Sequence, residues 1–167
     1  PGEIFYAGVG GHREAGESWP ACVHRESLEE IGVDITLLPS AATYYVPHDR
    51  EVQPVEISDQ PRPLALYEMI HPAGTPREGG LYRIVIYRAR LNDLPASLAV
   101  EEVRALIALT EDQVRRGAER KPTIRELLQE GAMILAGQDQ IVLENRLYPM
   151  GTAAALSRIL CVIPPAQ

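Results

Sequence analysis

Cysteine is scarce in this sequence of 167 residues, which contains only Cys22 and Cys161. Two cysteines are too few for the disulfide framework that stabilises many small secreted domains. Each also falls in a segment whose apolar pattern predicts a helix. This usage favours a reducing compartment, and we predict a cytoplasmic protein.

Long apolar runs are also missing from the sequence. No stretch approaches the roughly 18 consecutive apolar residues of a membrane-spanning helix. No charged segment followed by an apolar one forms a leader at the start. We therefore expect a soluble protein that has no membrane partner.

Positive charge is in short supply as well. The sequence has 16 Lys and Arg residues against 23 Asp and Glu residues, which gives a formal net charge of −7. Nucleic acids and anionic membranes both require a basic surface, so we expect neither as a partner. Any phosphate group of a ligand must therefore be bound locally. The length suits one domain with a sizeable core.

The most informative stretch is residues 11–33, which reads GHREAGESWPACVHRESLEEIGV. Ser18 is a good N-cap, because its hydroxyl can accept a hydrogen bond from an amide of the first turn. Pro20 falls in that first turn, where no backbone donor is needed. Gly32 can adopt the left-handed conformation that ends many helices. These signals predict a helix over residues 19–31.

Three carboxylates share one edge of this predicted helix. At about 100° per residue, Glu26, Glu29 and Glu30 span an arc of roughly 100°, beside an apolar arc that can face a sheet. Carboxylates this close raise one another's pKa, so a structure that keeps them together needs a cation. Hard oxygen ligands suit Mg²⁺ or Mn²⁺. The alternative is a glutamate-rich helix face that is only solvated.

Arg25 lies among these acids in the sequence. Glu26 and Glu29 flank it at one and four positions further on, and Glu17 lies one loop away. Arg25 is therefore better placed to orient carboxylates than to bind a substrate.

The complete stretch resembles the Nudix box. That pattern is a glycine, five residues, a glutamate, seven residues, and then Arg-Glu-U-x-Glu-Glu-x-Gly-U, where U is a bulky aliphatic residue. The positions that match in register are Gly11, Glu17, Arg25, Glu26, Glu29, Glu30, Gly32 and Val33. Ser27 is the one departure, because it stands where an aliphatic residue is expected. We expect Ser27 to face the sheet, and leucine there to stabilise the protein if the serine leaves a gap.

The resemblance implies an α+β fold, an α/β/α sandwich with a mixed sheet and the box as loop-helix-loop. We expect one Nudix hydrolase domain over residues 1–167, with a C-terminal helical extension over about residues 123–167. Members of the family carry several tens of residues, including a strand, before the box, and here there are ten. We therefore expect a preceding segment or a partner chain to supply that strand, which leaves a homodimer open.

The resemblance also implies divalent-metal-dependent hydrolysis of a nucleoside diphosphate linked to another group X. The implied metal ligands are Glu26, Glu29, Glu30 and the Gly11 carbonyl, with Mg²⁺ or Mn²⁺ as the cofactor. The implied catalytic residues are Glu29, Glu30, Arg25 and Glu102, where Glu29 or Glu102 is the base. Glu17 supports Arg25 from outside the ligand set.

The Nudix box recognises only the diphosphate of a substrate, so it does not identify the group X. Long insertions after residue 46 and the missing basic surface favour ADP-ribose or another nucleotide sugar. A nucleoside triphosphate pyrophosphatase is one alternative. Others are a nucleotide-sensing domain without catalysis, which usually lacks a box glutamate, and a purely structural acidic helix.

Alternating and apolar runs predict strands over residues 4–9, 35–38, 41–46, 64–70, 81–91 and 103–109. Residues 47–63 and 71–80 are polar connections, and long connections in compact domains are usually functional or disordered. Capping boxes at Thr110 and Thr123 open two helices, of which the second ends near Gly137. Thr152 caps a last helix that ends near residue 160. Residues 141–143 are either a strand or an extended connection.

Several residues outside the box have two interpretations each. Glu101 and Glu102 stand before the strand at 103–109, where Nudix enzymes often place a further carboxylate, or they belong to a solvated acidic loop. Base stacking or half-buried packing would explain Tyr44, Tyr45 and Tyr82. Phosphate binding or a surface position would explain Arg62, Arg77, Arg83 and Arg146. His12 and His24 lack partners at zinc spacing, and His71 before a proline suggests a turn.

Overall fold

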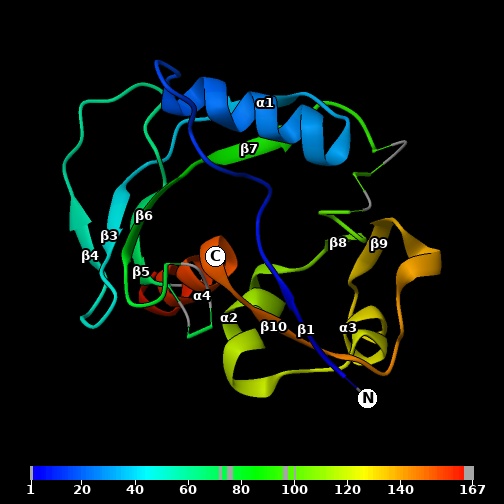
Figure 1. Ribbon diagram of the computed structural model, residues 1–167. Coiled ribbons are helices and arrows are strands. Elements are labelled where there is room, and N and C mark those ends of the chain that lie inside the picture. Colours follow the sequence, from blue (N-terminus) through cyan, green and yellow to red (C-terminus); the bar gives the residue numbers. More distant parts are fainter. Residues whose placement is uncertain (1, 72, 75–76, 96–97, 100, 164–167) are drawn as a thin grey trace.

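A computed structural model describes residues 2–71, 73–74, 77–95, 98–99 and 101–163 (Figure 1). The helices are α1 Trp19–Ile31, α2 Glu111–Arg120, α3 Ile124–Gln129 and α4 Gly151–Val162, with a 3₁₀ turn at Gln138–Gln140. The strands are β1 Glu3–Tyr6, β2 Ile35–Leu38, β3 Thr43–Val46, β4 Gln53–Val55, β5 Ala65–Ile70, β6 Leu81–Ile86, β7 Arg88–Leu91, β8 Leu106–Ala108, β9 Met133–Ala136 and β10 Arg146–Pro149. No helix within these ranges has both the length and the apolar character that crossing a bilayer requires.

The largest sheet has four strands in the order β4-β3-β5-β6. It is mixed, because β3 and β5 run parallel while the other two pairings are antiparallel. Val46 and Ala65 on this sheet are fully buried against Ala155 and Ile159 of α4. Figure 1 shows α1 along β7 at one side of the molecule and α2 and α4 at the opposite side. The expected α+β fold with a mixed sheet is confirmed.

The described residues also form three two-stranded sheets. β2 pairs with β7 and β8 pairs with β9, both antiparallel, whereas β1 and β10 are parallel. A second buried cluster, built around Ile124, Leu127, Ala132 and Leu147, lies where β1 and β10 meet the α3 region. This cluster anchors the strand that leads into residues 11–33.

The helix predicted over residues 19–31 forms with those bounds. The Ser18 hydroxyl accepts a hydrogen bond from the Ala21 amide at 3.2 Å, as expected of an N-cap. At the other end Gly32 has φ of 66° and its amide donates to the Leu28 carbonyl at 3.1 Å. Both ends of α1 are therefore set by local contacts that a sequence can reveal.

Several predicted strand bounds are wrong because pairing partners are distant in the sequence. The run at 81–91 divides after Ile86, since β6 pairs with β5 while β7 pairs with β2. The connection at 47–63 contains β4, which pairs with β3. The strands expected at 4–9 and 103–109 are shorter, as β1 and β8 show.

The chain after residue 123 differs most from the prediction. α3 ends at Gln129 instead of near Gly137, and residues 133–136 form β9, which pairs with β8. β10 was not predicted at all, and residues 141–143 form a connection outside any strand. The segment is therefore not helical throughout, and residues 164–167 lie outside the described part. The N-cap of α4 is Met150, not Thr152, and it makes no side-chain capping hydrogen bond. Thr152 lies inside the helix, where its hydroxyl accepts a hydrogen bond from the Gly8 amide at 2.7 Å.

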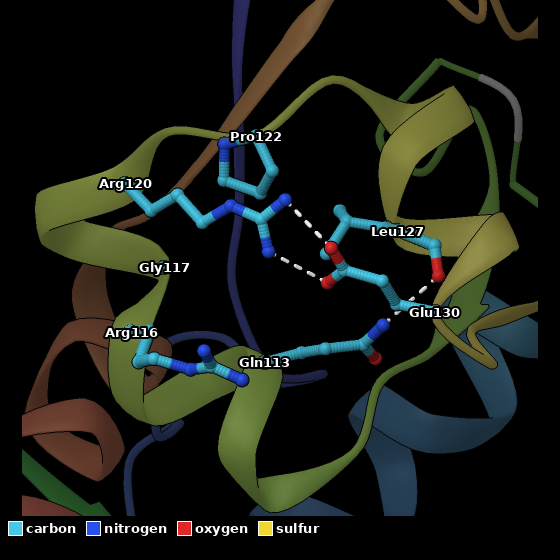
Figure 2. A pocket seen from close by; sticks show the side chains of 7 residues that line it. All are labelled: Gln113, Arg116, Gly117, Arg120, Pro122, Leu127 and Glu130. Atoms are coloured by element: carbon cyan, nitrogen blue, oxygen red, sulfur yellow. Dashed lines mark hydrogen bonds and ion pairs between the residues drawn. The ribbon is translucent and has the colours of Figure 1, made fainter.

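Two polar interactions join α2 to α3 around the pocket drawn in Figure 2. The Arg120 guanidinium pairs with the Glu130 carboxylate at 2.6 Å, and the Gln113 side-chain amide donates to the Leu127 carbonyl at 2.9 Å. Gln113 also closes the capping box with Thr110. These contacts fix the angle between two short helices, which supports the buried cluster beneath β1.

Ser27 is fully buried on the inner side of α1, as the pattern predicted. Its hydroxyl does not leave an empty gap, however. It donates a hydrogen bond to the Val33 carbonyl at 2.6 Å. The serine therefore ties α1 to the residue that follows its C-cap, and the expected benefit of leucine does not follow.

We expect Ser27→Ala to lower the free energy of unfolding by about 1–3 kcal/mol, because it strands a buried carbonyl. Ser27→Leu should cost more, since the larger side chain adds overpacking of about 1–3 kcal/mol. Urea denaturation of the parent and both variants measures the difference. A leucine variant as stable as the parent would show that the site has room and that the hydrogen bond contributes little.

Candidate active site

The loop between β1 and α1 brings Gly11 against Glu26 of α1. A Cβ atom on residue 11 would overlap the Glu26 carboxylate, so only glycine allows this approach. Glu26 is 8% exposed, which is low for a carboxylate. In Figure 1 this loop follows β1 from the middle of the molecule to the start of α1. The loop and the helix thus place one backbone segment and one carboxylate in direct contact.

Arg25 links the acids around it. Its Nη1 donates to the carboxylates of Glu26 and Glu29, each at 2.8 Å. Its Nε and Nη2 donate to both oxygens of Glu17 at 3.0 and 3.1 Å. Nη2 also donates to the His12 carbonyl at 3.0 Å. One guanidinium therefore orients three carboxylates and the box loop, as the sequence suggested.

Glu30 faces the box loop from the same helix. Its carboxylate accepts a hydrogen bond from the Gly10 amide at 3.0 Å. Burial raises the pKa of Glu30 above its ordinary value, and the charges of Glu26, Glu102 and Glu29 raise it further, against the Gly10 hydrogen bond. Glu26, Glu29 and Glu30 are called the acidic edge below. Crowding at this edge is the condition that a bound cation relieves.

The loop that carries Glu101 and Glu102 is tied to the end of α1. The Ala99 amide donates to the Glu30 carbonyl at 2.9 Å, and the Glu102 amide donates to the Ala99 carbonyl at 2.8 Å. Glu102 lies close enough to Glu30 for its charge to affect the Glu30 pKa. A second chain segment therefore brings a carboxylate towards the acidic edge.

The oxygen donors of this region fit a hard divalent cation, but they do not converge on one point. Among the residues that the structure describes, no three His, Cys, Asp or Glu side chains are grouped at metal-binding geometry. The contacts give the reason, since Arg25 holds Glu26 and Glu29 while Gly10 holds Glu30. Carboxylate and carbonyl oxygens remain the donors that Mg²⁺ and Mn²⁺ prefer.

The tyrosines singled out from the sequence lie in three different environments. Tyr44 packs against the core beneath α4. The Tyr45 hydroxyl donates to Glu68 at 2.6 Å. Tyr82 lies beside two histidine rings, with centroid distances of 5.3 Å to His12 and 5.0 Å to His71. Of these three tyrosines, Tyr82 is the one whose ring lies against a residue of the box loop.

The candidate arginines do not gather at the acidic edge. Arg62 donates to the Ala41 carbonyl at 2.9 Å, Arg83 pairs with Glu68 at 3.2 Å, and Arg146 donates to the Lys121 carbonyl at 3.0 Å. Burial raises the pKa of the Tyr82 phenol, and the charge of Arg77 acts in the opposite direction, so Arg77 lies near Tyr82. His24 pairs with Asp34 at 2.8 Å.

Sequence reasoning missed two contributions of the box loop, the Gly10 amide that binds Glu30 and the His12 ring against Tyr82. The glycine pair before the box hints at the first, since glycine allows close backbone approach. No local signal announces the second, because His12 and Tyr82 are distant in the sequence.

Comparison with known protein families gave one match. A family model described as NUDIX domain matches residues 2–130, which is more than half of the chain. No curated protein and no solved structure matches the chain.

Acid should weaken the contact between Glu17 and Arg25. The Arg25 hydrogen bond lowers the pKa of Glu17 from 4.5 to about 2. A carboxyl with a lowered folded-state pKa stabilises the protein above its unfolded pKa, and the contribution disappears as pH falls through the folded one. The stability difference between the parent and Glu17→Gln should therefore be constant above about pH 5 and shrink between about pH 4.5 and 2. Urea denaturation across this range measures it, and a difference independent of pH would exclude the ion pair.

Proposed function

Because this chain belongs to the Nudix family, we propose that it cleaves the diphosphate of a nucleotide sugar of the ADP-ribose type at the acidic edge of α1. Family membership makes it an enzyme, a pyrophosphohydrolase of small nucleotide substrates in which a nucleoside diphosphate is linked to another group X. Such hydrolases generally use divalent cations. The nucleotide sugar and the choice of Mg²⁺ or Mn²⁺ are the proposal.

The observation that carries the site is the cluster built by one loop and one helix. Gly11 touches Glu26, Arg25 binds Glu26 and Glu29, and Glu30 is held by the Gly10 amide. We assign Glu26, Glu29, Glu30 and the Gly11 carbonyl as metal ligands. A bound cation would supply neutralisation of the diphosphate charge and a Lewis acid for the reacting phosphate.

Residues of the chain position the metal ligands and activate the attacking water. Arg25, supported by Glu17, holds the Glu26 and Glu29 carboxylates in position before substrate arrives. This preorganisation matters because phosphoryl transfer depends mainly on positioning and charge stabilisation. Glu29 or Glu102 accepts the proton of the attacking water. Glu102 approaches from a different segment than α1, so a substrate between them can be reached from two sides.

The reaction breaks one phosphoanhydride bond. The water oxygen forms a new bond to one phosphorus in line with the leaving phosphate, whose bond to that phosphorus breaks. One water proton goes to the carboxylate base. The products are a nucleoside monophosphate and the phosphorylated group X.

The connection at 47–63 supports a substrate larger than a diphosphate. It is held to the fold at several points: β4 pairs with β3, and Arg158 of α4 donates to the carbonyls of Pro47 at 2.7 Å and Arg50 at 2.5 Å. Since β4 lies within it, the connection consists of two shorter loops, and loops held on a rigid scaffold often carry binding residues. We infer that this segment helps to select the group X.

A substrate panel with identified products tests the proposal. With Mg²⁺ or Mn²⁺, we expect ADP-ribose to give AMP and ribose 5-phosphate faster than nucleoside triphosphates or dinucleoside polyphosphates react. Glu30→Gln should lower turnover about 100-fold or more with the fold retained, as expected when a preorganised charged group is lost. Glu119→Gln, an exposed acid on α2, is the matched control.

Turnover of nucleoside triphosphates alone would overturn the nucleotide sugar and leave the pyrophosphohydrolase. Near-normal activity of Glu30→Gln would overturn the metal-ligand assignment.

Glu102→Gln should lower kcat more than it raises KM, because a base acts mainly on the chemical step. Glu101→Gln is the neighbouring control and should behave like the parent. Steady-state kinetics across pH with ADP-ribose measure both variants. If both match the parent, the base lies in the box itself, with Glu29 as the first candidate, or in the connection at 71–80.

A further inference from the structure

Three ring side chains from separate parts of the chain meet next to the box loop. His12 follows Gly11, His71 follows the end of β5, and Tyr82 lies on β6. The ring centroid of Tyr82 is 5.3 Å from that of His12 and 5.0 Å from that of His71. The ring planes are tilted by 50° and 54°, so the rings do not cover one another's faces as a parallel stack would. We call these residues the ring cluster.

The ring cluster is attached to the acidic edge through the box loop. The His12 carbonyl accepts the Arg25 hydrogen bond at 3.0 Å, so the backbone that carries this imidazole is fixed by the residue that orients Glu26 and Glu29. The negative charge of Glu26 also acts on Tyr82, where it adds to the effect of burial in raising the phenol pKa. The rings and the carboxylates are therefore parts of one region.

The other side of the ring cluster is held by the connection between β5 and β6. The His71 amide donates to the Gly80 carbonyl at 2.9 Å, and the Gly79 amide donates to the His71 carbonyl at 3.1 Å. The His71 ring lies over Gly80, where a Cβ would be 3.7 Å from its Cδ2 atom. Tyr82 is fixed by its place opposite Met69 in the β5–β6 ladder. The backbone that carries His71 and Tyr82 is thus fixed by hydrogen bonds.

Packing alone does not explain why the ring cluster consists of two histidines and a tyrosine. Imidazole gains less from burial than an aliphatic side chain, and His12 is exposed. Within the described residues, His24 is the one histidine that pairs with a carboxylate, so charge pairing does not explain His12 or His71. Aromatic rings at the edge of a site that receives nucleotides are suited to stacking, since every base presents a π-face.

We propose that the Tyr82 ring stacks on the planar base of the nucleotide and that the tilted rings of His12 and His71 contact the rim of that base, while the acidic edge acts on the diphosphate. This assignment rests on the proposed function, because it names the part of the same site that recognises the nucleoside. It gives Tyr82 a ligand-binding role that Tyr44 and Tyr45 do not share.

Proton NMR of the histidine C–H signals tests the stacking without turnover. The signals of His12 and His71 are assigned by their loss in His12→Gln and His71→Gln. AMP, titrated into the parent protein with Mg²⁺, should shift both signals by the ring current of the base. His24, which pairs with Asp34, is the internal reference that should not move. Ribose 5-phosphate, which has the sugar and phosphate but no base, should shift neither His12 nor His71.

Kinetics with substituted Tyr82 supply a second readout. Tyr82→Leu should raise KM for ADP-ribose about 10-fold with little change in kcat, within the range found when a stacking ring is removed. Tyr82→Phe keeps the ring and should stay close to the parent. Tyr45→Leu is the matched control, because Tyr45 points to the opposite face of the same sheet.

The outcomes separate the stacking from the reaction. Unmoved His12 and His71 signals at millimolar AMP would overturn the stacking, and so would equal shifts with ribose 5-phosphate. A loss of kcat in Tyr82→Leu with unchanged KM would also contradict it. If AMP shifts both signals but no nucleotide sugar is cleaved, the stacking stands and the proposed function fails.

Discussion

The structure of the site depends on one guanidinium among acids. Arg25 forms hydrogen bonds to Glu17, Glu26 and Glu29 and to the backbone of the box loop. Without this charge, the carboxylates of one helical edge would repel one another, and the loop would lose its main polar contact with α1. Arg25 therefore holds together the elements that a cation and a diphosphate would later join. Its five donors in a planar fork make this possible, and lysine could not replace them.

The helix at the centre of the site could be predicted from the sequence because its determinants are local. Ser18, Gly32 and the spacing of the glutamates act within a few residues, so the start, the end and the acidic edge of the helix can be predicted from a short stretch of sequence. Ser27 shows the limit of this reasoning. Its burial followed from periodicity, but its hydrogen bond to Val33 depends on how the chain turns after the helix.

Contacts between distant segments could not be predicted in the same way. Nothing in residues 81–91 marks where β6 leaves β5 and β7 joins β2. β10 was missed because Arg146–Pro149 has no apolar run and ends in a proline, so only its pairing with β1 identifies it as a strand. The same reason hides the approach of His12 to Tyr82, which needs both the box loop and the β5–β6 ladder to be in place. Sequence patterns thus predict the chemistry of α1 better than the surroundings that select a substrate.

The pairing of β1 with β10 has a consequence for how the protein is made. Glu3 lies opposite Arg146 in this ladder, so the contact that anchors the box loop closes a long loop that runs from Glu3 to Arg146. Contacts between residues so far apart form slowly, since a long loop must be closed before they contribute. β10 also lies beyond the residues that match the family model. During synthesis α1 can fold early, but the strand before it stays unpaired until β10 has emerged from the ribosome. The box loop in front of the acidic helix is therefore anchored only after β10 has been made.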